Sequence, residues 1–390
     1  MARRALLKAI NRSAILNIIK RHGPIARADI ARLIKLSPAT VTMQTSELIE
    51  DGLIYEKQEG DSRGGRPPIL LALTTSAIFV IGVKLTEAHI VLALTDLNAE
   101  IVARKTLPLQ STEPTAVAEL MTQAINDLLA TAEVPRKHLL GVGVGTAGII
   151  DSANGIIRMS PHTHWRDVPF AEIVEDKLGC AVYLDNNVNT LTLLERLYGP
   201  GQHNDNFLVI TVGLGVGMGM VCNGKIYRGA SGGGGEFGHT VVDPDGLRCS
   251  CGNMGCLETF VADPWLVYRA KQAKLDVTTP DDLVWLARRG DEAAERILRD
   301  AGLVLGQGVA NLINVFNPSM VIISGEGVRA GDFLFAPMHT AIRRHSFWKL
   351  DQQVDFRIEP LHDESWARGA ASLVLNKVFE IEEAQTSSTR

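Results

Sequence analysis

The chain has 390 residues, of which 46% are hydrophobic, 36 are Gly, 16 are Pro and 5 are Cys. These values exclude a disordered chain, a collagen-like chain and a small disulfide-held domain, and the length predicts two or three domains. The net charge of -5 is unevenly distributed: residues 1–70 contain twelve Lys and Arg against seven Asp and Glu, whereas the remainder contains 27 against 37. A basic segment joined to an acidic body indicates a nucleic-acid-binding module fused to a second function.

The first helices follow one another closely and are separated by clear breaks. A first helix ends at His22-Gly23-Pro24, and a short second helix covers about residues 28–35. Ser37-Pro38 is predicted to begin a third helix, with Ser37 as the N-cap, and Gly52 to end it. Two strand-forming segments around a basic loop follow, so we predict a winged helix-turn-helix.

Seven side chains of this module are candidates for contact with double-stranded DNA. Hydroxyl and amide groups of the third helix can meet base edges and phosphates in a major groove, and the loop arginines can lie in a minor groove. The candidates are Ser37, Thr40, Thr42, Gln44, Thr45, Arg63 and Arg66. The alternative is a small helical subdomain with a solvated basic face, which the charge excess and the order of elements disfavour.

From residue 79 onward, strand-like and helix-like segments alternate. The predicted elements are strands at 79–83, 89–96 and 100–107, a helix over about 114–132 and a strand at 139–144. A second segment, which begins at Phe207 and includes a turn at Asn223-Gly224, repeats that opening. The repeat predicts two lobes of related α/β design, each with helices packed on a mixed sheet.

Two segments could be mistaken for an export signal or a membrane helix, and the sequence disfavours both interpretations. The N-terminal segment interleaves charged and apolar residues instead of forming a signal peptide, so we expect a cytoplasmic location. The nineteen residues from Asn206 to Gly224 carry no charge, which is the length of a membrane helix. Their glycines alternate with apolar residues, however, and we therefore predict strand structure there.

His239 and three of the five cysteines form the sharpest motif of the sequence. Cys249, Cys251 and Cys256 fall within eight residues, and one imidazole with three thiolates makes a complete tetrahedral shell for Zn²⁺. A disulfide is the competing use, but the C-x-C spacing is strained and the expected compartment is reducing. We predict structural zinc, with no position left for an activated water.

Several polar side chains around this motif suit a sugar, whose hydroxyls each donate and accept hydrogen bonds. The candidates are Asn186, Asn187, Glu236, His239 and Glu258. Taken singly, each is better explained as a surface or capping residue, and only the family resemblance given next brings them together.

The sequence resembles the ROK family, which groups sugar-responsive transcriptional repressors with sugar kinases. Two elements are diagnostic in that family: E-x-G-H, here at residues 236–239, and C-x-C-G-x-x-G-C-x-E, here at residues 249–258. Further matching pieces lie at residues 141–151, 314–318 and 368–371, and the match runs from about Arg12 to Phe379. The resemblance implies a two-lobed, actin-like ATPase fold of the RNase H-like type, zinc on His239 and the three cysteines, and sugar in the cleft between the lobes.

A winged helix-turn-helix ahead of the sugar domain is the arrangement of the family's repressor branch, whose members respond to sugars such as xylose and N-acetylglucosamine. We therefore expect a DNA-binding domain at residues 1–73 and a ROK domain at residues 75–390. Its lobes are expected at about 75–188 together with the C-terminal helix, and at about 189–365.

Three departures from the kinase pattern predict that the ROK domain is not an enzyme. The D-x-G-G-T phosphate loop is replaced by Lys84-Leu85-Thr86-Glu87-Ala88, which contains no glycine and carries an acid. Asn187 stands where the kinases have the Asp that accepts the proton of the sugar hydroxyl, and an amide cannot act as that base. The second phosphate loop, Gly213-Leu214-Gly215, lacks the hydroxyl of the kinase G-T-G sequence.

The sequence thus favours a homodimeric or higher oligomeric repressor of genes for carbohydrate uptake or catabolism, with operator DNA and a monosaccharide or related polyol as partners. Xylose, glucose, N-acetylglucosamine and inositol-like ligands all fit the pattern. The alternatives are a ROK sugar kinase or bifunctional kinase and regulator, and a sugar lobe that only docks another protein. In the third helix, Met43 replaces the Arg of many family repressors, which removes one expected DNA contact.

Overall fold

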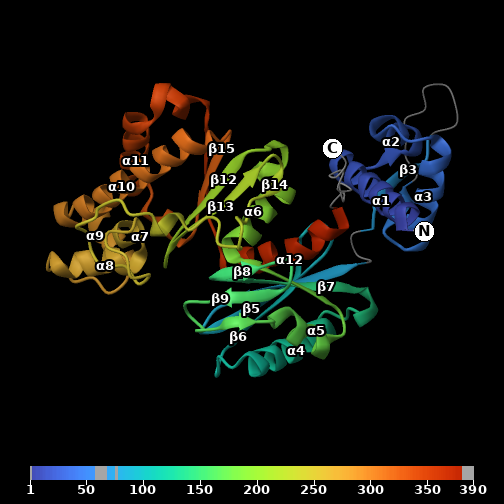
Figure 1. Cartoon of the computed structure of the whole chain (residues 1–390), viewed down its shortest axis with the longest axis horizontal. Helices are drawn as coiled ribbons and strands as arrows, with labels where there is room; N and C mark the ends of the chain where they lie inside the picture. The colour runs from blue at the N-terminus through green and yellow to red at the C-terminus, as the bar shows by residue number, and fades with distance from the viewer. Residues whose placement is uncertain (1, 58–67, 75–77, 380–390) are drawn as a thin grey trace.

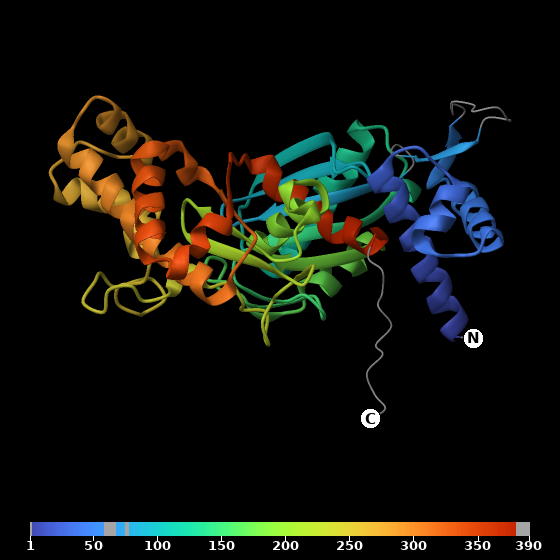
Figure 2. The same cartoon turned by 90° about the horizontal axis from the view of Figure 1, so that it is seen from above.

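The computed structural model of the chain describes residues 2–57, 68–74 and 78–379, with side chains from residue 11 onward. A small head, drawn in blue, lies at one end of the molecule, and two larger lobes follow it (Figure 1). Helix α12 (Asp363–Phe379) runs between the lobes and ends beside the head (Figure 2). None of the described helices is long and apolar enough to cross a membrane.

The head is a winged helix-turn-helix, which confirms the prediction. Its elements are α1 (Ala2–His22), β1 (Ile25–Ala26), α2 (Arg27–Ile34), α3 (Pro38–Glu50), β2 (Ile54–Lys57) and β3 (Leu70–Leu73). The Ser37 hydroxyl accepts the backbone N–H of Thr40 at 3.1 Å, so α3 begins with the predicted cap. Strands β2 and β3 pair antiparallel and form the base of the wing, and β1 pairs with β3 on its other edge.

The first lobe is a five-stranded sheet in the order β11-β7-β4-β5-β6. Strands β4, β5 and β6 form an antiparallel meander, and β7 and β11 add parallel strands on the other side of β4. The elements are β4 (Phe79–Leu85), β5 (His89–Thr95), β6 (Ile101–Pro108), α4 (Pro114–Thr131), η1 (Arg136–His138), β7 (Leu139–Thr146), β8 (Ile149–Asp151), β9 (Ile156–Met159), β10 (Arg166–Val168), α5 (Phe170–Leu178) and β11 (Ala181–Asn186). Helices α4 and α5 lie side by side on one face of the sheet (Figure 1).

The second lobe repeats that topology, with the strand order β14-β13-β12-β15-β16. Again a meander of three strands is extended by two parallel strands, as the internal repeat in the sequence predicts. The strands are β12 (Phe207–Val212), β13 (Val216–Cys222), β14 (Lys225–Ile226), β15 (Met320–Ser324) and β16 (Asp355–Glu359). The helices are α6 (Asn187–Tyr198), η2 (Pro200–His203), η3 (Phe237–His239), α7 (Glu258–Val261), α8 (Asp263–Gln272), α9 (Pro280–Arg288), α10 (Glu292–Phe316), η4 (Glu326–Ala330), α11 (Asp332–His345) and η5 (Phe347–Gln353).

The uncharged segment Asn206–Gly224 forms two strands rather than one. The chain reverses at Gly213-Leu214-Gly215, where the N–H of Gly213 donates to the carbonyl of Gly215 at 3.0 Å. The alternation of apolar residues continues through this turn, so periodicity alone did not reveal it. The reversal places the turn at the edge of the second lobe, with Leu214 80% exposed.

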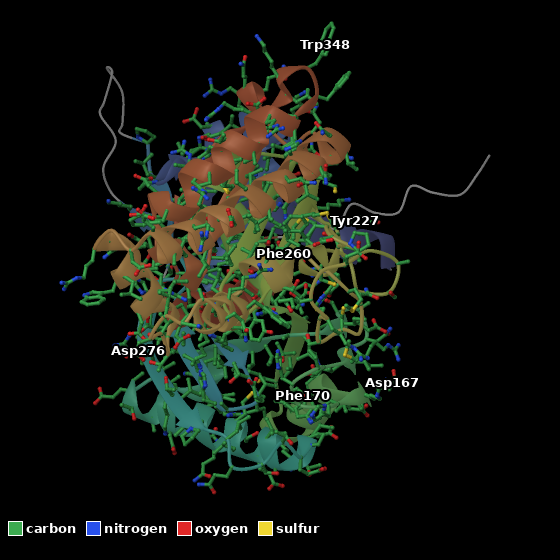
Figure 3. All side chains as sticks on the ribbon, turned by 90° about the vertical axis from the view of Figure 1, so that its left-hand side faces the viewer. Asp167, Phe170, Tyr227, Phe260, Asp276 and Trp348 are labelled. Carbon is green, nitrogen blue, oxygen red and sulfur yellow. The ribbon has the colours of Figure 1, made fainter. Side chains whose placement is uncertain are left out.

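Each lobe has its own apolar core. Phe170 is fully buried in the first lobe, whereas Trp348, 87% exposed, projects from the far end of the second lobe (Figure 3). Helix α12 packs closely on the sheet of the first lobe because glycines of β4 and β7 face it. A Cβ at Gly82 or Gly143 would overlap the carbonyl oxygens of α12.

The head contacts the body through α1, α6 and the end of α12. The Ser13 hydroxyl donates to the carbonyl of Val378 at 3.4 Å. The Lys20 ammonium lies 3.6 Å from the centre of the Tyr198 ring, at the end of α6, and 4.4 Å from that of Phe379. Burial, together with the positive charges of Arg21 and Arg196, lowers the pKa of Lys20 to about 7.

Candidate functional site

His239 and the three cysteines converge on one point of the second lobe. One ligand atom from each of His239, Cys249, Cys251 and Cys256 lies within 4.8 Å of the others. The Sγ atoms of Cys251 and Cys256 are 3.6 Å apart, and Cys249 Sγ is 3.5 Å from Nδ1 of His239. These separations match neighbouring ligands of a tetrahedral metal ion, since Zn–S and Zn–N bonds of about 2.0–2.3 Å place ligands about 3.5–3.8 Å apart.

Tight turns in the loop between η3 and α7 bring the cysteines together. Gly252 and Gly255 have φ angles of +100° and +63°, which residues with a Cβ rarely adopt. The bridges Val241–Cys256 and Arg248–Met254 hold the two sides of the loop together. The four residues are therefore placed so that together they could hold one metal ion.

The chemistry of the thiols also suits a cation. Burial and the neighbouring sulfurs of Cys251 and Cys249 raise the pKa of Cys256 to about 12. Three adjacent thiolates would repel one another in the absence of a positive ion, whereas a bound metal deprotonates coordinating thiols. The donor set fits a metal that prefers sulfur and imidazole ligands.

The two nitrogens of His239 point to different partners. Nδ1 lies beside Cys249, toward the cysteine cluster, while Nε2 lies 3.9 Å from the carboxylate of Glu236. A metal on Nδ1 would leave the Nε2–H free to donate to an acceptor beyond the cluster. The same residue can thus hold the metal and take part in the adjacent polar site.

Glu236 and Glu258 lie on the same side of the lobe as His239. Burial raises the pKa of the Glu236 carboxyl, His239 opposes this shift and Glu258 adds to it. The Oε2 atom of Glu258 accepts the backbone N–H of Val216 at 3.2 Å, just after the Gly213–Gly215 turn. The structure thus brings three of the five candidate sugar residues together beside the cysteines.

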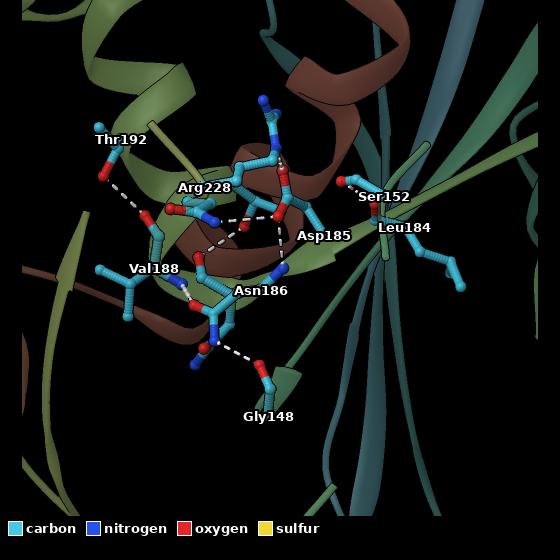
Figure 4. A network of polar contacts seen from close by, with 11 residues as sticks. Gly148, Ser152, Leu184, Asp185, Asn186, Val188, Thr192 and Arg228 are labelled. Carbon is cyan, nitrogen blue, oxygen red and sulfur yellow. Dashed lines mark hydrogen bonds and ion pairs between the residues drawn. The ribbon is translucent and has the colours of Figure 1, made fainter. Parts of the chain in front are cut away.

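Asn186 and Asn187 lie at the N-terminal end of α6. The Asn186 side chain caps α6, because its Oδ1 accepts the N–H of Val188 at 2.8 Å and its Nδ2 donates to the carbonyl of Gly148 at 3.0 Å (Figure 4). No protein group in the described part of the chain hydrogen-bonds the side chain of Asn187, which is half-buried. Asn187 is therefore the amide better placed to meet a ligand.

An ion pair between the lobes went unrecognised in the sequence. Asp185, at the end of β11, is 1% exposed, and its Oδ2 accepts Nε of Arg228 at 2.7 Å. Arg228 follows β14 in the second lobe, so the pair connects the end of β11 in the first lobe with the second lobe (Figure 4). Its partners are 43 residues apart, and the signal in the sequence is an Asp directly before the Asn-Asn pair.

The face of α3 differs from the predicted DNA contacts at two positions. Gln44 and Thr45 are buried, at 1% and 0% exposure, and Thr45 accepts Nε of Arg27 at 3.0 Å. They face the interior because they lie beside Val41 and Leu48, one turn away on the same side of the helix. As placed here, neither side chain can reach a base, and their assignment as DNA contacts is corrected.

The outer face of α3 is formed by other residues. Ser37 and Thr42 are exposed and Thr40 is half-buried, so these candidates remain accessible. Met43 and Ser46 are also exposed, and the sequence analysis did not include Ser46. Ser46 lies three residues after Met43 and four after Thr42, so helical spacing could have identified it as part of the same exposed face. Arg63 and Arg66 lie outside the described residues.

The fold and this site define a body of two repeated α/β lobes that carries a winged helix-turn-helix head. A winged helix-turn-helix DNA-binding profile matches residues 9–55, and the ROK family profile matches residues 80–377. The chain belongs to the ROK family.

Relatives and solved structures of both branches match this chain. It is 30% identical to the xylose repressor of Caldicellulosiruptor bescii, over 98% of this chain and 100% of that protein. It is 31% identical to the DNA-binding transcriptional dual regulator NagC of Escherichia coli, over 86% and 85% of the two chains.

One solved regulator matches the head as well as the body, whereas a solved kinase matches a smaller share of the chain. A ROK transcriptional regulator, a homologue of the E. coli MLC protein, superposes with a TM-score of 0.86 at 27% identity over 96% of this chain and 98% of that one. A ROK glucokinase of Streptomyces griseus, solved with glucose and AMPPNP, matches with a TM-score of 0.64 at 29% identity. The match covers 76% of this chain and 98% of that chain.

Proposed function

We propose that this protein is a sugar-responsive, DNA-binding transcriptional repressor of genes for carbohydrate uptake or catabolism. The observation that carries the proposal is that repressors match both parts of the chain, head and body, nearly end to end. Residues 1–73 would bind operator DNA, and residues 75–390 would bind a monosaccharide or related polyol. Two heads on a homodimer or higher oligomer would address half-sites about 34–36 Å apart.

In this proposal, the His239 cluster binds Zn²⁺ with a structural role. The four protein ligands fill a tetrahedral shell, and bound zinc would fix the loop that carries Glu236 and His239 against α7. The sugar would lie between this loop and Asn187, with Glu258 and Asn186 supporting its two sides. Carboxylates, an imidazole N–H and an amide provide the mixture of acceptors and donors that a polyol needs.

Helices α6 and α12 provide a route from the sugar site to the head. Asn187 begins α6 at the site, and Tyr198 ends the same helix under Lys20 of α1. Helix α12 packs along α6 and ends at Phe379, the other ring that contacts Lys20. A sugar that changes the angle between the lobes would therefore move the surface on which the head rests.

The structure around the former phosphate loops supports a body without kinase activity. Lys84 stands at the end of β4, where the kinases carry their first phosphate loop, and its ammonium pairs with Asp363 of α12 at 2.8 Å. At the second loop, a Cβ on Gly213 would overlap the carboxylate of Glu326. Carboxylates beside this turn would repel the negative charge of a nucleotide phosphate. The amide of Asn187 cannot act as the base that accepts the proton of the sugar hydroxyl.

We expect no sugar phosphorylation by the purified chain. With Mg²⁺-ATP and each of glucose, xylose, N-acetylglucosamine and N-acetylmannosamine, ADP release should equal the sugar-free background in a coupled assay. Asn187→Asp should not restore turnover, because the phosphate loop is still missing. A ROK glucokinase assayed in parallel provides the positive control, and formation of any sugar phosphate by the wild-type chain would contradict this part of the proposal.

We expect a sugar to stabilise the full chain in a thermal-shift screen of the four sugars above together with myo-inositol. A ligand at about 100 times its Kd adds about 2.7 kcal/mol, which raises Tm by roughly 4 °C for a domain of about 300 residues. Asn187→Ala should lose most of the shift, whereas the exposed control Asn311→Ala should keep it. If no sugar shifts the wild-type Tm, the effector role fails and the docking alternative gains support.

A further inference from the structure

Asp185 is the buried centre of a polar network at the end of β11. Its Oδ1 accepts the backbone N–H of Asn186 at 2.8 Å and Nδ2 of Asn189 at 3.0 Å, and its Oδ2 accepts Nε of Arg228 at 2.7 Å (Figure 4). Both carboxylate oxygens are therefore engaged. A carboxylate buried to this degree is stable only with such partners, and loss of one leaves an uncompensated charge.

Arg228 reaches this network from the other lobe. It follows β14, and its side chain is 35% exposed, while the Asp185 side chain is 1% exposed. The pair thus joins the strand end that leads into Asn187 with the segment of the second lobe that leads to Glu236. An arginine gives this contact a fixed direction because its planar guanidinium binds a carboxylate in a defined orientation.

The segment between Arg228 and Glu236 has little rigidity of its own. Five of its seven residues are glycines, at positions 229, 232, 233, 234 and 235. The N–H of Gly234 donates back to the carbonyl of Arg228 at 2.9 Å, and a Cβ on Gly232 would overlap the carbonyl of Ile150 in the first lobe. Glycine-rich backbone gains conformational freedom when its ends are released, so its geometry depends on its anchors.

We propose that Asp185 and Arg228 are positioning residues of the effector site. Their contact anchors the segment 229–236 against the N-terminal end of α6 and so holds the carboxylate of Glu236 at a fixed distance from the amide of Asn187. Neither residue needs to touch the sugar. This inference rests on the proposed sugar-binding function, and its first test below is independent of any sugar.

The first test measures hydrogen exchange of the full chain without sugar. In Arg228→Met, the amides of residues 229–236 should exchange at least about tenfold faster than in the wild type, because the anchor is lost and the segment opens locally. Arg299→Met, which removes an exposed arginine of α10, is the matched control and should leave this segment unchanged. Equal exchange in Arg228→Met and the wild type would overturn the inference.

The second test measures affinity for the sugar that gives the largest thermal shift in the wild type. Arg228→Met and Asp185→Asn should each bind it roughly 10- to 100-fold more weakly, since a displaced polar group loses its hydrogen bonds to the ligand. The double variant Asp185→Asn with Arg228→Gln exchanges the ion pair for an uncharged hydrogen bond. It should bind more tightly than the summed losses of Asp185→Asn alone and Arg228→Gln alone predict.

These outcomes separate a positioning role from general support of the fold. A variant with lowered Tm, but with wild-type sugar affinity and bound metal, would overturn the inference. If the segment is anchored as predicted and the wild type responds to no sugar, the anchoring stands and the proposed function fails.

Discussion

Replacement of Cys256 by Ser is expected to abolish metal binding and to lower the Tm of the chain by roughly 5–8 °C, which corresponds to a loss of about 3–5 kcal/mol. The Cys256 thiol is completely buried between the loop and α7, so a hydroxyl there leaves an open coordination position and an unsatisfied polar group. The metal content of the purified protein, measured by mass spectrometry, and a melting curve together test this result.

A matched control uses a cysteine outside the cluster. Cys222 is partly exposed and belongs to β13, and Cys222→Ser should retain one metal ion per chain and a Tm near that of the wild type. Chelation of the wild-type metal should also weaken the sugar response before the lobes unfold, because Glu236 and His239 belong to the same loop. A wild-type protein purified without metal, or a Cys256→Ser variant with unchanged Tm, would contradict the structural role.

Binding to operator DNA is expected to depend steeply on salt. If the head neutralises six to ten phosphates, affinity for DNA upstream of its own gene should fall by about 10³–10⁵ between 50 and 200 mM salt. Arg66→Ala should weaken binding roughly tenfold and reduce the salt slope by about 1. Arg344→Ala, on the exposed end of α11, is the control. Salt-independent binding would contradict the basic head as the DNA-binding part.

Two further variants separate the exposed face of α3 from its buried face. Thr42→Ala should weaken DNA binding by about 1 kcal/mol or more without changing Tm, since its side chain is exposed. Gln44→Ala should act mainly on the stability of the head, because Gln44 is 1% exposed beside Val41 and Leu48. Equal effects of the two variants on DNA affinity at unchanged Tm would contradict the placement of α3 described here.

Local patterns predicted the parts of this fold that depend on neighbouring residues. Ser37-Pro38 identified the start of α3 because an N-cap and a Pro in the first turn act within a few residues. The cysteine spacing identified the cluster because all three thiols lie on one short loop. The repeat of the strand pattern at Phe207 predicted a second lobe with the same topology as the first.

Features that depend on packing were less accessible from the sequence. Gln44 and Thr45 are polar, so their types favoured exposure, but the phase of α3 against α1 and α2 buries them. The turn at Gly213–Gly215 interrupts a segment whose alternation continues unbroken. Asp185 and Arg228 meet only when the lobes are assembled, and no spacing rule relates residues 43 positions apart in two sheets.

The measurement that tests the central claim most directly is the DNA affinity of the full chain with and without its sugar. Fluorescence anisotropy with labelled DNA from upstream of its own gene gives both dissociation constants at one salt concentration. We predict that a saturating concentration of the stabilising sugar changes the Kd for DNA at least about fivefold, the lower end of typical allosteric coupling. Specific DNA binding with the same Kd in the presence and absence of that sugar would contradict a sugar-responsive repressor.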